Sequence, residues 1–326
     1  MKLTIIKALF LLPILLWSCS QPGATRLQNS SAPTDAPQPL IFSEGLISTS
    51  DYETHPAFSP TGDTIYFLKG TPNVKYFTIC VSYKQDTGWT APVIATFSGK
   101  YLDADPFVTK DGNTIYFVSN RPANVGDSIR KDWDIWKVER SGTGWSNPVH
   151  LDSNFNTNEN EYFPTLAANG NFYFGSERPG GKGNSDMYVS KYKSGKYAAP
   201  ENLGDSINTP DNEYEPFIAP DESYLIFMGT YPATISNSDF CISYNVNGKW
   251  TKAIKLPAPI NSPATEWGGK VSPGGKYFFF GSNRSTVKDV LPKNESIDQF
   301  QERLHSVGNG LGDIYYVNLS ALKPIK

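Results

Sequence analysis

The chain has 326 residues, enough for one large β domain or two average domains, and its formal charge is −3 at pH 7. Aromatic residues make up 13% of it and accompany 27 glycines and 25 prolines, a mixture typical of many short strands joined by tight turns. Acidic and basic residues are interspersed without a basic stripe, which argues against a nucleic-acid partner.

The N-terminal segment has the pattern of an export signal. Lys2 and Lys7 supply positive charge, and the apolar run at 8–17 is too short to cross a bilayer as a stable helix. The sequence Leu-Trp-Ser-Cys, ending at Cys19, resembles the bacterial lipobox, although an ordinary signal with a chance cysteine is the alternative. The resemblance implies a signal peptide at 1–18, acylation of Cys19, and export to the periplasmic or cell-surface side of a membrane, held there only by the lipid.

A tether follows the predicted lipidation site. Residues 19–38 are rich in Ser, Gln, Pro, Ala and Thr and have few large apolar side chains, so this segment cannot form a core. We expect it to be flexible and to separate a folded domain at 39–326 from the membrane.

Five copies of one unit fill the folded domain. Each copy has a strand that opens near a Pro, a tight turn, an aromatic second strand, a third strand that usually begins with Asp, and a short fourth strand. The repeat length is that of a β-propeller blade. The turns and second strands read SPTGDTIYF, TKDGNTIYF, AANGNFYF, APDESYLIF and SPGGKYFFF.

The fifth copy has no fourth strand of its own. The segment 36–42 at the N-terminal end matches the other fourth strands, so we expect it to complete the last blade and remove an exposed sheet edge. The sequence therefore predicts an all-β, five-bladed β-propeller closed by its N-terminal strand. The alternative is six blades, with a degenerate sixth in 285–312. Cys80 and Cys241 fall at equivalent positions of the first and fourth blades, which are not neighbours, so we expect two buried free thiols.

The repeat resembles the WD-like propeller repeat of the TolB family. The residues that carry this resemblance are DPFVTKDGNTIYFVSNRP, FGSERPGGKGNSDMY, and KVSPGGKYFFFGSNRS followed by GDIYY. The resemblance implies the fold and leaves the function open, because TolB itself has six blades, an extra N-terminal domain and no lipid.

The long loops are expected on one face of the propeller. The turns between first and second strands and between third and fourth strands are minimal, whereas the other face carries the long loops and the crossovers between blades. Because binding residues favour long loops on a rigid scaffold, we expect function on that second face. The longest loop, 285–312, contains Ser296 to Gln299, which matches a capping box, and apolar residues at helical spacing. It predicts a short amphipathic helix with its apolar side down, as a lid, a partner contact or a decorative insertion.

Candidate site residues lie at the expected mouth of the central channel. An acid precedes each anchor by three residues and could form a negative ring for a cation such as Ca²⁺, or could join neighbouring blades through repeated arginines. One position before the anchor the copies differ, and three of them carry an ionisable side chain that could form a metal or sugar site. The acids are Glu53, Asp103, Glu161, Glu213 and Glu266, the arginines are Arg121, Arg178 and Arg284, and the three variable residues are His55, Asp105 and Glu215.

These features predict a non-catalytic binding or scaffold propeller of the bacterial cell envelope, monomeric, with an envelope protein or a glycan as partner. No G-x-S-x-G, H-E-x-x-H or P-loop occurs, and no cofactor is expected. The alternative is a glycan-active hydrolase or lyase that uses acids at the channel mouth, because five-bladed propellers host several glycosidase families.

Overall fold

The structure is a computed structural model that describes residues 38–73, 75–230, 238–287 and 295–322. The predicted signal peptide, Cys19 and almost all of the predicted tether lie outside these ranges, as do parts of two long loops.

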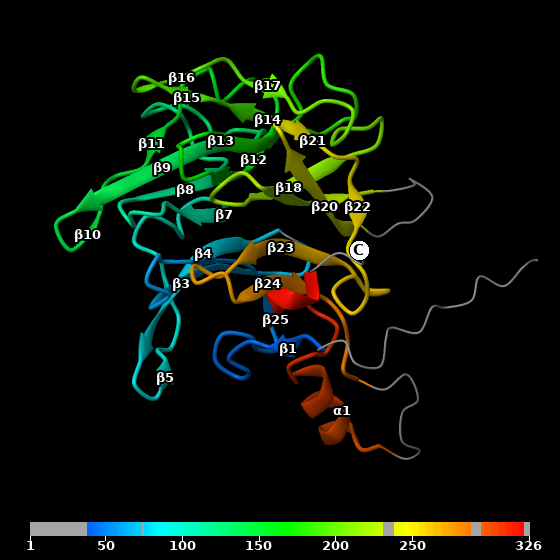
Figure 1. The fold of residues 1–326 in the computed structure, drawn as a ribbon. Coiled ribbons are helices and arrows are strands. Elements are labelled where there is room, and N and C mark those ends of the chain that lie inside the picture. The colour runs from blue at the N-terminus through cyan, green and yellow to red at the C-terminus, as the bar shows by residue number, and fades with distance from the viewer. Residues whose placement is uncertain (1–37, 74, 231–237, 288–294, 323–326) are drawn as a thin grey trace, which may run out of the picture.

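Five small antiparallel sheets form a ring, and each sheet is one blade (Figure 1). The innermost strands of consecutive blades contact one another in the order β2, β7, β12, β18, β23, and β23 in turn contacts β2, which closes the ring.

Blade 1 contains β2 (Tyr52–Phe58), β3 (Thr64–Gly70), β4 (Phe77–Gln85), β5 (Gly88–Trp89) and β6 (Val93–Ile94). Blade 2 contains β7 (Asp103–Val108), β8 (Thr114–Ser119), β9 (Asp134–Ser141), β10 (Gly144–Trp145) and β11 (Val149–His150). Blade 3 contains β12 (Glu161–Leu166), β13 (Phe172–Ser176), β14 (Asp186–Ser190), the hairpin β15 (Tyr192–Lys193) and β16 (Lys196–Tyr197), and β17 (Glu201–Asn202). Blade 4 contains β18 (Glu213–Ile218), β19 (Tyr224–Gly229), β20 (Asp239–Val246), β21 (Lys249–Trp250) and β22 (Ile254–Lys255). Blade 5 contains β23 (Glu266–Val271), β24 (Tyr277–Ser282), β25 (Asp313–Asn318) and β1 (Leu40–Ile41), and the chain then forms a 3-10 turn at Leu319–Leu322.

The second strand of each blade supplies the core between blades. In β3 the four consecutive residues Ile65 to Leu68 are all buried, because each face of a blade packs against a neighbouring blade. One phenylalanine occupies the same repeat position in every blade and is fully buried in all five. Each such ring contributes roughly 1.5–3 kcal/mol of hydrophobic stabilisation. These residues are Phe67, Phe117, Phe174, Phe227 and Phe280.

The N-terminal strand β1 occupies the outer edge of blade 5. It pairs antiparallel with β25, with Leu40 opposite Tyr316 and Ile41 opposite Tyr315. The amide of Phe42 then donates to the carbonyl of Ile314 at 2.7 Å. Residues near opposite ends of the sequence thus share one sheet.

The prediction of five blades is confirmed, and the six-blade alternative is wrong. The described part of 285–312 contains a helix and one isolated bridge, Ser285 to Asn309, rather than a further sheet. Cys80 and Cys241 are buried and unpaired in β4 and β20, as expected from their equivalent positions.

The predicted helix is present as α1 (Ile297–Leu304), but its predicted orientation is wrong. Ser296 caps it, and Gln299 completes the capping box. No residue of α1 is buried, and Ile297, Phe300 and Leu304 are 66%, 39% and 50% exposed. In Figure 1 the helix projects away from the five sheets, and its apolar side is largely exposed among the described residues.

Candidate functional site at the propeller axis

Each innermost strand carries the same backbone irregularity. The residue two positions after the repeated acid has a positive φ, between 52° and 60°, and the pairing register with the second strand shifts there. Such a bulge turns one side chain away from the regular alternation of the strand. The five residues in this position are His55, Asp105, Phe163, Glu215 and Gly268.

These residues come from different blades and contact one another, which places them at the axis of the ring. The His55 Nε2 atom lies 3.2 Å from Oε1 of Glu215 and 3.6 Å from Oδ1 of Asp105. The Phe163 ring stacks on the His55 ring with centroids 5.7 Å apart. The amide of Gly268 donates to Oε2 of Glu215. The structure thus brings His55, Asp105 and Glu215 into contact with one another.

Burial and charge act together on this axial cluster. The side chains of His55, Asp105 and Glu215 are 12%, 8% and 5% exposed. Burial by itself lowers the pKa of His55, but the two carboxylates outweigh it and raise that pKa above 6.5. Burial raises the pKa of Asp105 to about 6, and Glu215 adds to the rise while His55 and Lys270 oppose it.

Lys270 is the member of the cluster that the sequence analysis missed. Burial lowers its pKa to about 8, while Asp105 and Glu215 act in the opposite direction. It belongs to β23, and the four other blades have Ala57, Phe107, Thr165 and Phe217 at the same repeat position. The sequence signal for Lys270 was that the other four blades have uncharged residues at the same repeat position.

The five repeated acids are not exposed to the channel. Each of their side chains is fully buried, so the expected negative funnel does not form from them. A Thr or Ser four residues upstream hydrogen-bonds the carboxylate in blades 1, 3, 4 and 5. For example, Glu161 accepts from the amide and the hydroxyl of Thr157, both at 2.8 Å. The buried acids are Glu53, Asp103, Glu161, Glu213 and Glu266.

The predicted arginines complete this arrangement. Arg284 donates to Glu266 at 2.9 Å and to the carbonyls of Pro259 and Ile260 in the crossover from blade 4. Arg121 is bonded in the same way to Asp103 and to the carbonyl of Phe97. Arg178 lies 3.5 Å from Glu161 and donates to the carbonyl of Phe155 at 2.7 Å. In blade 1 a lysine, Lys69, takes the place of the arginine beside Glu53. The acids and bases therefore fix the crossovers between blades.

A repeated asparagine fixes the same crossovers and was also missed. Its side-chain oxygen accepts from the backbone of the preceding blade's third strand, which replaces a strand-to-strand hydrogen bond. Because this residue lies five positions before the acid in three blades, the repeat alignment contained the signal. The pairs are Asn156 with Ile135 at 2.7 Å, Asn208 with Met187 at 2.9 Å, and Asn261 with Phe240 at 2.8 Å.

The acid that begins the third strand has a side-chain partner in blades 2, 3 and 4 but only a backbone partner in blade 5. Asp134 lies 2.7 Å from Nε2 of His150, and Asp239 accepts from Lys255 at 2.6 Å. In blade 5, Ile41 stands at the position of these partners, opposite Tyr315. Asp313 is left with one hydrogen bond, from the amide of Gly308, and its Oδ1 atom has no partner. Burial raises its pKa to about 7, and Glu53 and Glu44 add to the rise.

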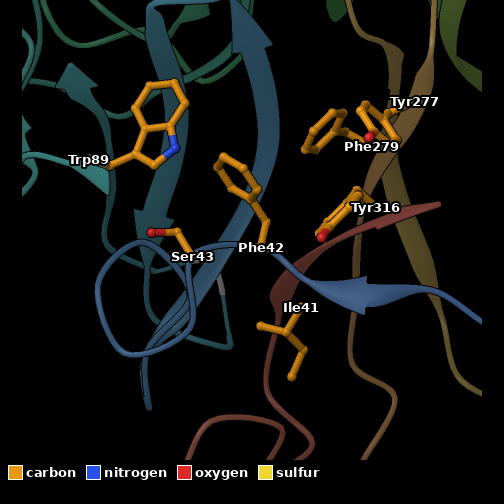
Figure 2. A pocket seen from close by; sticks show the side chains of 7 residues that line it. All are labelled: Ile41, Phe42, Ser43, Trp89, Tyr277, Phe279 and Tyr316. Carbon is orange, nitrogen blue, oxygen red and sulfur yellow. The ribbon is translucent and has the colours of Figure 1, made fainter. Parts of the chain in front are cut away.

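The described pockets lie away from the axis. One pocket of about 350 Å³ is at the seam between blades 5 and 1 and is walled by aromatic rings (Figure 2). A second, of about 310 Å³, lies between the first turns of blades 1 and 2. The second pocket is on the face of short turns, and the first lies at the outer strands of its seam, whereas we expected the binding surface on the other face.

The described residues contain no group of three or more His, Cys, Asp and Glu side chains placed to hold a metal ion. None of their helices is long and apolar enough to cross a membrane.

Comparison with known proteins gives the fold. No protein-family model matches the chain. No curated protein matches it either. Among solved structures it is similar to an α-L-arabinofuranosidase from Lactobacillus brevis, at 12% identity over 84% of this chain and 92% of that one, with a TM-score of 0.51. It is also similar to the catalytic domain of the Coprinopsis cinerea GH62 α-L-arabinofuranosidase, at 11% identity over 87% and 97%, with a TM-score of 0.50. A putative TolB from Agrobacterium tumefaciens matches at 16% identity over 82% and 90%, with a TM-score of 0.46. The chain is a five-bladed β-propeller.

Proposed function

We propose that this chain is a non-catalytic binding propeller of the bacterial cell envelope and that its partner is an envelope protein. The observation that carries the proposal is the exposed apolar side of α1. Ile297, Phe300 and Leu304 follow one another at spacings of three and four residues, which places them on one side of the helix. The loop that carries them is much longer than its counterparts in the other blades. Apolar residues that gather on one side of an exposed helix are typical of a helix that docks in a groove of another protein.

The filled axis supports binding over catalysis. A catalytic pair of carboxyl groups needs room for a substrate between and above them. Here the imidazole of His55 lies against both Asp105 and Glu215, and Phe163 stacks on it. The axial cluster therefore fills the axis and joins all five blades.

Site-specific crosslinking tests the proposal. A photoreactive residue in place of Phe300 should crosslink one envelope protein in living cells, and Phe300→Asp should prevent co-purification of that protein. The matched control replaces Val125, which is fully exposed on a loop of blade 2. The same crosslinked partner from both positions, or capture that survives Phe300→Asp, would refute the role of α1.

The location in the envelope has its own test. The lipobox-like sequence before Cys19 supports acylation at that residue. Labelling of cells with an alkyne fatty acid should mark the wild-type protein and leave Cys19→Ala unmarked. Fractionation should then find the variant in the soluble exported fraction.

A glycan-active hydrolase is the second candidate. Burial raises the pKa of Asp105 to about 6, which suits a general acid or base near neutral pH. The solved structures with a TM-score of 0.50 or above include two arabinofuranosidases. Glu161 and Glu213 are poorer candidates for the catalytic acid and base than Asp105 and Glu215, because Thr157 and Thr209 hydrogen-bond their fully buried carboxylates. Release of arabinose from arabinan that is lost in Glu215→Gln would favour this function.

A further inference from the structure

In blades 1, 2 and 3 a tyrosine at one repeat position has a hydrogen-bond partner for its hydroxyl, whereas blade 4 has Ile226 there. Between blades 1 and 2, the Trp145 indole donates to the Tyr66 hydroxyl at 3.1 Å. Between blades 2 and 3, Tyr197 and Tyr116 are hydrogen-bonded. In blade 3 the equivalent hydroxyl, that of Tyr173, donates to Glu222 at 2.7 Å.

Blade 5 also lacks this tyrosine. Phe279 stands at the repeat position of those tyrosines and has no hydroxyl to offer Trp89. Phe42 lies between the two, with its ring centroid 5.6 Å from Trp89 and 5.2 Å from Phe279 (Figure 2). Phe42 occupies the place that a smaller Ala95 or Leu151 takes after other fourth strands, because all three amides donate to the third strand in the same way.

The seam between blades 5 and 1 contains a pocket with aromatic walls and with polar atoms that have no partner among the described residues. Trp89 and Ser43 face it from one side, and Tyr277, Phe279 and Tyr316 from the other, with Phe42 between them (Figure 2). The Trp89 indole N–H, the Ser43 hydroxyl and the hydroxyls of both tyrosines make no hydrogen bond within the described part of the chain. Ligand sites combine apolar walls with a few polar groups in this way.

The chemistry of the lining selects the ligand. No charged side chain lines the pocket, which disfavours ions and charged peptides. Broad indole and phenol faces suit the apolar C–H face of a sugar ring, and a sugar also carries hydroxyls that can bond to a tyrosine hydroxyl or an indole N–H at the edge of the ring. The volume of about 350 Å³ fits one or two sugar rings.

We propose that the seam pocket of blades 5 and 1 is a binding site for a neutral saccharide unit, stacked on Trp89 and hydrogen-bonded by Tyr277 and Tyr316. The site is independent of the protein-binding role of α1, because Trp89 and Tyr277 border the short turns while α1 belongs to a loop of the other face.

The test is calorimetric titration of the exported domain with neutral arabinan, galactan, mannan and β-glucan oligosaccharides of three to six units. We expect saturable binding of at least one of them. Trp89→Leu should weaken it about tenfold or more, and Tyr316→Phe, which removes one hydroxyl and leaves the shape, should weaken it about threefold to tenfold. The matched control is Trp145→Leu at the equivalent seam, which should leave the affinity unchanged.

Three results would overturn the proposal. They are no saturable binding of any of these oligosaccharides, binding that survives both Trp89→Leu and Tyr316→Phe, and equal losses in Trp145→Leu and Trp89→Leu. Circular dichroism and the unfolding midpoint show whether each variant is folded, and Tyr316→Phe keeps the test decisive if Trp89→Leu does not fold.

Discussion

Nε2 of His55 lies 3.2 Å from Oε1 of Glu215, although 160 residues separate them in the sequence. This contact crosses the axis of the ring and joins blade 1 to blade 4. With Asp105 and the half-buried Lys270 it forms a cluster of two acids and two bases at the axis, and removal of one member leaves the others uncompensated.

The first prediction concerns His55. His55→Phe should lower the free energy of unfolding by roughly 3 kcal/mol at pH 6, because Asp105 and Glu215 lose the cation between them. Phenylalanine is a suitable probe because Phe163 already adopts the same positive φ at the equivalent position. Urea unfolding measures the loss, and the double variant with Glu215→Gln should recover part of it. Strictly additive losses would contradict the coupling.

The second prediction concerns Asp313, whose Oδ1 atom has no hydrogen-bond partner. Its pKa in the folded protein is about 7, above its ordinary value of 3.8. The folded state thus keeps a proton that the unfolded state releases, so this group's contribution to stability falls as the pH rises from about 4 to 7 and stays low above that. Asp313→Asn should therefore raise stability at pH 8, by on the order of 2 kcal/mol, and flatten the dependence on pH.

The control for Asp313 is the equivalent acid of blade 3. Asp186 accepts from the amides of Lys182 and Gly183 and from Asn202 at 2.7 Å. Asp186→Asn should destabilise the protein, because its new NH₂ group would face these donors. Thermal unfolding of both variants from pH 4 to 8 makes the comparison. Equal effects of the two substitutions would show that the missing partner of Asp313 has no consequence.

The third prediction concerns Gly268, which has a φ of +60°. A Cβ atom there would lie 2.7 Å from Cα of His55, so Gly268→Ala must displace the axial cluster. We expect a loss of about 2 kcal/mol or more of stability. Gly274→Ala is the control, because a Cβ there meets nothing within 4 Å. Chemical denaturation of the two variants should separate them clearly.

The fourth prediction concerns the crossover clamp of blade 5. Arg284→Met removes a cation that holds the buried Glu266 and two backbone carbonyls, and should cost roughly 3 kcal/mol. The exposed pair of Lys191 and Glu201, more than half exposed on both sides, gives the comparison. Lys191→Met should change stability by less than about 1 kcal/mol. Similar losses in both variants would argue against a structural role for the clamp.

The fold was predictable because the repeat states the same physical requirement five times. A Gly or Asp turn followed by an aromatic run specifies a hairpin, and the phenylalanine at the fourth place of that run is buried in every blade. Comparison of the copies also identified His55, Asp105 and Glu215 as candidates, because only a difference between equal blades makes an ionisable group at the axis visible.

The remaining features depend on tertiary contacts that one sequence does not contain. The sequence pattern of the repeated acids predicted a ring that lines the channel. In the structure, hydroxyl groups and basic side chains pack around acids such as Glu161 and Glu266 and bury them. The spacing of Ile297, Phe300 and Leu304 defines an apolar side of α1 but not what lies beneath it. The seam pocket needs Phe42 and Phe279, from opposite ends of the sequence, to be brought together.

The pairing of β1 with β25 has a consequence for synthesis in the cell. Leu40 and Ile41 are synthesised before all the other strands of the ring, but their partners Tyr316 and Tyr315 emerge only after those strands. Until then the growing chain presents incomplete blades with unpaired strand edges, which favour aggregation. The ring can close only when β25 has been synthesised. We therefore expect the chain to stay unfolded, bound to chaperones, until then and to fold in one late step.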